Sequence, residues 1–199
     1  MKYPEIALLP ILMFGDYFLT VLGAIQKEKK YTDHFKTEHY ELNPMWQKTI
    51  TQKLWFNPRH ILITVLVSGI LTYLLECGDL PQAFAEGVLG CLFIPYGMII
   101  GRHFSNLLIF DRLIHKPEEI SSQITMAHSL TLSISMYQYL VVGIPMCMLA
   151  IFSPTPFVLG ALIGIVMIFL NHLNWIRRQK NKTSKKSSSE ATQNPGATQ

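Results

Sequence analysis

Charged residues are scarce in this chain and unevenly distributed. Only 15% of its 199 residues are Asp, Glu, Lys or Arg, whereas a soluble domain usually carries about a quarter. No charged residue occurs between Glu119 and Arg177. An apolar stretch of about 20 residues already crosses the hydrocarbon core of a bilayer, so this run is long enough for two crossings. The sequence therefore predicts an integral membrane protein.

Cysteine is also rare, and the motifs of common enzyme classes are missing. Cys77, Cys91 and Cys147 form no CxxC pair and cannot all be paired, which argues against a disulfide framework and against a zinc site. The chain contains no GxSxG, no HExxH and no glycine-rich phosphate-binding loop. We therefore expect no metal site, and the sequence identifies no cofactor.

Asparagine–proline pairs and turns divide the apolar residues into five predicted spans. Asn43-Pro44 and Asn57-Pro58 each have asparagine in the N-cap position and proline in the first helical position, which is typical of a helix start. The expected spans are residues 4–25, 58–75, 83–101, 124–152 and 156–176. The predicted fold is an all-α, polytopic membrane helix bundle that forms one domain over residues 1–178.

Two further segments accompany these spans. Trp46, Ile50 and Leu54 recur every four residues after the first Asn-Pro pair, which predicts a short amphipathic helix in the membrane interface. Residues 179–199 are rich in Ser, Thr, Gln, Asn and Lys. This composition predicts a disordered, basic and polar cytosolic tail.

The basic residues predict the orientation in the membrane. Residues 26–59 contain seven Lys or Arg, residues 102–119 contain three and the tail contains six, whereas Lys2 is alone on the other side. Because basic residues concentrate in cytosolic loops, we expect the N-terminus outside and the C-terminus in the cytosol, in the plasma (inner) membrane. Clusters beside spans favour anionic membrane lipid as a partner over nucleic acid.

Asp16 is the most unusual residue of the predicted spans. It lies about nine residues from the cytosolic end of the first span, or about 14 Å along a helix, near the middle of the bilayer. A carboxyl group there costs at least about 2.5 kcal/mol to insert, so it needs a partner or water. Thr20 follows one turn later on the same face. Asp16 is either protonated and bonded to a neighbouring helix for packing, or functional.

Two short motifs carry a resemblance to a known group of proteins. The motif D-x-x-L-T at residues 16–20, followed by E-L-N-P at residues 41–44, resembles small uncharacterised prokaryotic multi-span membrane proteins. Those proteins carry D-x-x-L-T in their first span and E-x-N-P just after it, and the similarity covers about thirty residues here. The resemblance implies no activity. It implies that four residues act as a unit, namely Asp16, Thr20, Glu41 and Asn43, although helix capping alone would explain the asparagine.

More polar residues follow the third predicted span. Arg102 and His103 stand at its cytosolic end, and Asn106 shares a face with Arg102 if the helix continues. An arginine is suited to bidentate binding of a phosphate or a carboxylate. A basic flank of the kind found at the cytosolic end of many spans would explain Arg102 equally well.

The fourth predicted span carries a polar stripe. At 100° per residue, one side of the helix collects Ser121, Thr125, His128, Ser135 and Tyr139. Such a stripe faces either neighbouring helices, through ordinary hydrogen bonds of Ser and Thr, or an aqueous cavity. The histidine is harder to explain by packing than the hydroxyl groups are.

Glycines line the third and fifth predicted spans. Gly87, Gly97 and Gly101 lie near one stripe of the third span, and Gly160 and Gly164 lie one turn apart in the fifth. Small residues at these spacings allow helices to approach closely. They are the expected contact surface for neighbouring helices and for a partner, either a second copy of the chain or another membrane protein.

Three functional hypotheses follow. The favoured one is binding or transport of a small polar or amphiphilic ligand in a cytosol-facing pocket within the membrane, by candidates Asp16, Thr20, Glu41, Asn43, Arg102, His103, Asn106, Thr125 and His128. An alternative is an intramembrane hydrolase or transferase, with acid–base or metal chemistry at Asp16, Glu41, His103 and His128. The third is a structural or accessory subunit. The first is favoured because no nucleophile or metal motif is recognisable.

Overall fold

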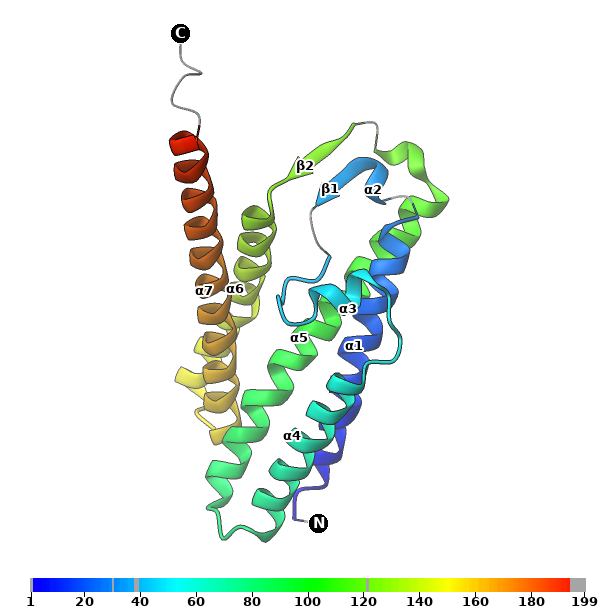
Figure 1. Cartoon of the computed structure of the whole chain (residues 1–199). Helices are drawn as coiled ribbons and strands as arrows, with labels where there is room; N and C mark the ends of the chain where they lie inside the picture. The colour runs from blue at the N-terminus through cyan, green and yellow to red at the C-terminus, as the bar shows by residue number, and fades with distance from the viewer. Residues whose placement is uncertain (1, 30, 38–39, 121, 194–199) are drawn as a thin grey trace.

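The protein is mainly helical, and five of its helices are long and apolar enough to cross a membrane. The computed structural model describes residues 2–29, 31–37, 40–120 and 122–193 (Figure 1). A short 3₁₀ turn, η1 (Pro4–Ala7), leads into the first long helix. The five long helices are α1 (Leu8–Lys27), α4 (Pro58–Cys77), α5 (Gln82–His115), α6 (His128–Phe152) and α7 (Pro156–Gln193). The prediction of a mainly helical protein with five long apolar helices is confirmed.

The long helices form two groups that meet at α5. α1 packs against α4 and α5, while α7 packs along α5 and against α6. The N-terminus and the turn between α4 and α5 lie at one end of the bundle, and the C-terminal end of α7 lies at the other (Figure 1). A buried apolar cluster that includes Leu9, Leu75 and Leu89 holds α1, α4 and α5 together near the N-terminal end.

Glycine allows α5 and α7 to approach closely. A Cβ atom added at Gly160 would lie 1.8 Å from the carbonyl oxygen of Gly87, and one at Gly164 would lie 2.3 Å from a carbonyl oxygen of α5. These three glycines are therefore used for packing within the chain. A Cβ atom at either of the other two predicted contact glycines, Gly97 and Gly101, would meet nothing within 4 Å.

The helix α5 is longer than the predicted span of residues 83–101. It continues through the expected polar connection to His115. No glycine or proline interrupts the chain between Arg102 and Lys116, so nothing in the backbone ends the helix at the membrane boundary. It ends where Lys116 precedes Pro117, because a residue before proline disfavours the helical conformation. Arg102, His103 and Asn106 thus belong to a continuous helix.

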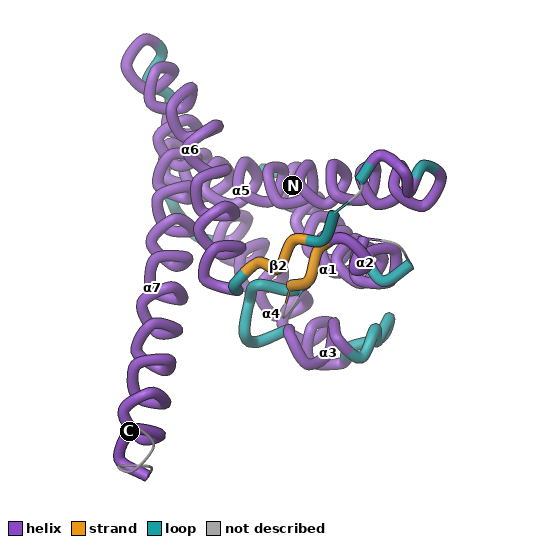
Figure 2. Tube along the Cα trace, turned by 90° about the horizontal axis from the view of Figure 1, so that it is seen from above, coloured by secondary structure: helices purple, strands orange, loops and turns teal. Residues whose placement is uncertain are grey.

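The helix α6 begins later than the expected residue 124. Instead, β2 (Ile124–Met126) pairs in parallel with β1 (Phe35–Thr37), with Thr125 opposite Lys36. Seen from above, this strand pair lies between α2 (Tyr31–His34) on one side and α6 with α7 on the other (Figure 2). This strand pair was not predicted, because a strand of three residues is too short to show an alternation of polar and apolar residues. The polar stripe of α6 is therefore reduced to His128, Ser135 and Tyr139, and Ser121 lies outside the described residues.

The segment expected to form an interfacial helix is shorter and more buried than predicted. α3 covers only Gln47–Thr51, and its Ile50 is 1% exposed, packed against Tyr17 and Val21 of α1. At the second Asn-Pro pair, the Asn57 side chain accepts hydrogen bonds from two backbone N–H groups of α4, as predicted for an N-cap. Asn43 instead caps the turn before α3, where its Oδ1 accepts from Met45 N at 3.1 Å.

The chain after the fifth span differs from the expected tail. α7 does not stop at residue 176 but continues to Gln193, and residues 194–199 lie outside the described residues. Lys, Gln, Ala and Glu are good helix formers, and extending an existing helix costs far less than starting one. The part of residues 179–199 that the structure describes is therefore a helical continuation of the span.

Candidate functional site

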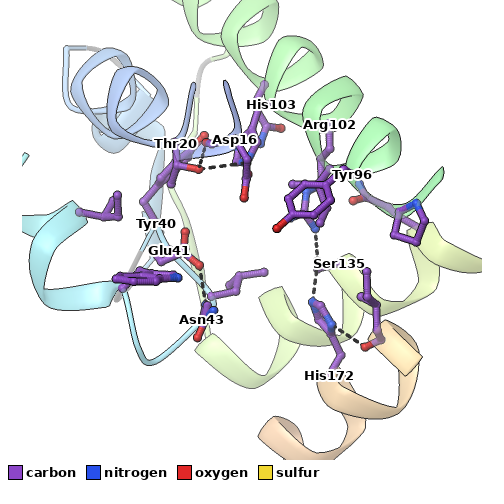
Figure 3. A pocket seen from close by; sticks show the side chains of 18 of the residues that line it. Asp16, Thr20, Tyr40, Glu41, Asn43, Tyr96, Arg102, His103, Ser135 and His172 are labelled. Atoms are coloured by element: carbon purple, nitrogen blue, oxygen red, sulfur yellow. Dashed lines mark hydrogen bonds and ion pairs between the residues drawn. The ribbon is translucent and has the colours of Figure 1, made fainter. Parts of the chain in front are cut away.

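A cavity of about 740 Å³ lies within the bundle. All five long helices contribute to its wall, together with residues 40–46 before α3. Seven of the nine candidate residues line it: Asp16, Thr20, Glu41, Asn43, Arg102, His103 and Asn106. Residues from three separate segments of the sequence are thus brought into one place (Figure 3).

Asp16 of α1 meets His103 of α5 on one side of the cavity. The Nε2 atom of His103 lies 3.0 Å from Asp16 Oδ1 and 3.1 Å from Thr20 Oγ1. The Thr20 hydroxyl donates its own hydrogen to the Asp16 carbonyl oxygen at 2.7 Å, so the imidazole N–H is the donor to both oxygens. The other ring nitrogen of His103 is buried and has no hydrogen-bond partner among the described residues. The deep carboxylate is therefore held by a buried histidine of another helix.

Glu41 enters the cavity from the connection before α3. Its Oε1 accepts a hydrogen bond from the backbone N–H of Asn43 at 2.6 Å. Desolvation raises the pKa of Glu41 to about 7, against the opposing effect of that hydrogen bond, and the negative charge of Asp16 adds to the rise. At neutral pH this side chain is therefore divided between its acid and ionised forms, whereas an exposed glutamate would be fully ionised.

Tyr40, beside Glu41, was missed by the sequence analysis. A Cβ atom added at Gly23 would lie 2.1 Å from its hydroxyl oxygen, so α1 leaves room for the ring only because glycine stands there. Lys27 Nζ lies 5.8 Å from the centre of the same ring. Desolvation raises the pKa of Tyr40 to about 12. No motif marks this tyrosine, because the irregular segment before α3 determines its position.

Arg102 lies across the cavity from these residues and begins a chain of hydrogen bonds. Its Nη1 donates to Ser135 Oγ of α6. Ser135 Oγ lies 3.2 Å from His172 Nε2 of α7, and His172 Nδ1 lies 3.0 Å from the carbonyl oxygen of Ile168. A carbonyl only accepts, so a neutral His172 carries its proton on Nδ1 and accepts the Ser135 hydroxyl hydrogen at Nε2. The chain links α5, α6 and α7 (Figure 3).

Several residues of this region lie elsewhere than the sequence analysis predicted, or were not predicted at all. His172, near the end of the fifth predicted span, was not among the candidates from the sequence, yet it is 4% exposed and bonded within the site. Ser135 was one member of the polar stripe, and that stripe was the only signal for it. Of the remaining candidates, Thr125 lies in β2 and His128 begins α6 as a buried residue, and neither lines the cavity.

The cavity also has an apolar side that reaches the outside of the bundle. Ile134 of α6 and Met167 of α7 both line it, and their side chains are 44% and 61% exposed. Both residues lie within helices that are apolar enough to cross a membrane. The cavity therefore joins a polar interior to an apolar outer surface. An amphiphile likewise has a polar head and an apolar chain.

Within the described ranges, no three His, Cys, Asp or Glu side chains are grouped so that they could hold a metal ion. No protein-family model, no curated protein and no solved structure matches this chain. The resemblance carried by residues 16–20 and 41–44 therefore stays a prediction, although all four of its polar residues line the cavity.

Proposed function

We propose that this chain is a multi-pass protein of the plasma (inner) membrane that binds or carries a small polar or amphiphilic ligand in the cavity. The five apolar helices support a membrane location. The concentration of Lys and Arg in residues 26–59, 102–119 and 177–186 supports an orientation with the N-terminus outside and the C-terminus in the cytosol.

The observation that carries the proposal is the cavity and its lining. Its volume of about 740 Å³ lies in the range of about 300–1,000 Å³ that is typical of small-molecule sites. Such sites combine apolar walls with a few converging polar groups. Here the polar groups come from α1, α5, α6 and α7, and they hold one another in place by hydrogen bonds at Asp16, His103, Arg102 and Ser135.

Native mass spectrometry of the protein purified from its own membrane tests this proposal. We expect a bound molecule in near-stoichiometric amount. Ile99 lines the cavity, so Ile99→Trp should reduce the bound fraction, whereas Leu108→Trp should not, because Leu108 lies on the same helix with its side chain 72% exposed. Equal occupancy in both variants, or no bound molecule in the wild type, would contradict the proposal.

A second candidate function is an intramembrane hydrolase or transferase. It is favoured by the Asp16–His103 pair, at 3.0 Å, facing the same cavity as Glu41, whose pKa is about 7. A carboxyl group with a pKa near the working pH is suited to general acid–base catalysis. His128, which the sequence analysis included in this candidate, lies outside the cavity lining.

Time-resolved mass spectrometry of the bound molecule separates the two functions. An enzyme converts the molecule to a product of different mass, and His103→Gln slows that conversion. A binding protein releases it unchanged. Purification of the chain with a stoichiometric protein partner and an empty cavity would instead support the accessory-subunit hypothesis.

A further inference from the structure

The guanidinium group of Arg102 faces the cavity without a carboxylate partner. Among the described residues, no Asp or Glu oxygen lies within 4.0 Å of its nitrogen atoms. Its hydrogen-bond acceptor is neutral, the hydroxyl of Ser135. An arginine within a membrane-spanning helix is costly unless an acid, backbone carbonyl or water accompanies it. No acidic side chain of the described residues is thus close enough to form an ion pair with this charge, and an anion from outside the chain can balance it.

The two carboxyl groups that share the cavity have other partners. Asp16 Oδ1 accepts from His103 Nε2, and Glu41 Oε1 accepts from the backbone N–H of Asn43. The charge of Arg102 lowers the pKa of Glu41, but desolvation outweighs this effect and raises the pKa to about 7, so Glu41 carries only part of a negative charge at neutral pH. The chemistry that fits the free edge of a guanidinium is an oxyanion, which accepts two parallel N–H hydrogen bonds.

The shape of the cavity indicates what carries the oxyanion. A small inorganic ion needs no exit toward the membrane, yet the exposed side chains of Ile134 and Met167 line the same cavity as Arg102. An alkyl chain attached to the oxyanion would lie along these residues and pass into the hydrocarbon region. A cavity of about 740 Å³ holds a headgroup and the first part of such a chain.

We propose that Arg102 binds the phosphate or carboxylate head of an anionic amphiphile, positioned by Ser135 and His172, whose apolar chain leaves the cavity over Ile134 and Met167. This proposal rests on the proposed ligand-binding function and specifies its ligand class. Ser135 and His172 act as positioning residues, since they hold the guanidinium through the hydrogen bonds from α6 and α7.

Tryptophan fluorescence provides the test, because Trp46 and Trp175 line the cavity. The full chain is purified in an uncharged maltoside detergent and titrated with dodecyl phosphate, dodecyltrimethylammonium and inorganic phosphate. We expect saturable binding of dodecyl phosphate that Arg102→Gln weakens by about 10- to 100-fold, the range for loss of hydrogen bonds to a charged group. Arg178→Gln, an exposed arginine of α7, serves as the matched control and should bind normally.

Two further variants and a test of folding separate the loss of the guanidinium from a loss of structure. Arg102→Lys keeps the charge but loses the fork of donors, so it should bind more weakly than the wild type and more tightly than Arg102→Gln. Size-exclusion chromatography verifies that each variant is folded. Ser135→Ala removes the hydroxyl that holds the guanidinium, so it should weaken the binding of dodecyl phosphate.

Three outcomes would overturn the proposal: equal binding of dodecyltrimethylammonium, equal binding of inorganic phosphate, or an unchanged affinity for dodecyl phosphate in folded Arg102→Gln. Tight binding of the cation would leave the proposed ligand-binding function intact and exclude only the anionic class. Failure of all amphiphiles, together with an empty cavity in the native mass spectrum, would remove both proposals.

Discussion

Two carboxyl groups face the same cavity in unlike surroundings. Asp16 is paired with the imidazole of His103, whereas Glu41 accepts from backbone N–H groups among the described residues. Desolvation destabilises the charged form of Glu41 and outweighs the opposing charge of Arg102. This difference predicts opposite consequences for substitution of the two residues.

Glu41→Gln should stabilise the protein above pH 7 and have little effect near pH 4.5. The pKa of Glu41 is about 7 in the folded protein, against 4.5 as its ordinary value. Between these values the folded state holds more protons than the unfolded state, so the contribution of Glu41 to stability is lost as pH rises. Melting temperatures from pH 4.5 to pH 8 in one detergent measure the difference. Glu118→Gln, at an exposed position, should follow the wild-type profile; an identical profile for Glu41→Gln would contradict the prediction.

Asp16→Asn and His103→Gln should be strongly coupled. Each single variant loses a buried hydrogen bond and should cost about 1–3 kcal/mol of stability. Because both remove the same contact, the double variant should cost less than the sum by about 1 kcal/mol or more. A double-mutant cycle on unfolding in detergent measures this, with Asp16→Asn and His128→Ala as the comparison pair. That second pair should be additive within about 0.5 kcal/mol, since His128 lies outside the cavity lining.

At the level of elements, the helices could be predicted from the sequence and their ends only in part. Long apolar runs and the Asn57-Pro58 start are local signals, and the structure agrees with them. The continuation of α5 past Arg102 was missed because hydropathy marks where a span leaves the membrane, whereas the backbone ends a helix at Pro117. The strand pair β1–β2 joins residues almost ninety positions apart, and no local pattern predicts such a contact.

In the candidate site, too, some residues could be found from local sequence signals and others could not. Asp16, Arg102 and His103 could be found because a charged or titratable residue in an apolar run is costly and therefore conspicuous. Tyr40 and His172 could not, because their roles depend on tertiary contacts with Gly23 and Ser135. Thr125 was wrongly assigned to the helical stripe, since it lies in β2, and His128, the first residue of α6, does not line the cavity.

The packing of α5 against α7 predicts which glycine is essential. A Cβ atom at Gly90 would lie 2.0 Å from the carbonyl oxygen of Phe157, whereas one at Gly97, on the same helix, would meet nothing within 4 Å. We expect Gly90→Ala to cost about 1–3 kcal/mol, the usual range for overpacking, because backbone must move. Gly97→Ala should change stability by no more than about 0.5 kcal/mol. Thermal unfolding of both in one detergent decides, and equal melting temperatures would show that α5 and α7 are not so closely packed.

At the scale of the whole molecule, the segments rich in Lys and Arg lie at the same end of the bundle as the C-terminal end of α7. The N-terminus and the α4–α5 turn, which has no Lys or Arg, lie at one end of the bundle (Figure 1). The C-terminal end of α7 and the connection between α5 and β2 lie at the other end. Charge pattern and helix arrangement are independent observations, and both agree with the proposed orientation.

Reporter fusions should therefore alternate along the chain. A reporter active only in the cytosol should be active after Lys116 and after Arg178, and one active only outside should be active after Asp79 and after Thr155. The reason is that residues 26–59, 102–119 and 177–186 hold sixteen of the seventeen Lys and Arg residues, and short basic loops are retained on the cytosolic side. Outside activity after Lys116 would contradict the orientation. The segment of residues 40–46, which lines the cavity, would then lie on the opposite side of the membrane, and the ligand would have to be sought in that compartment.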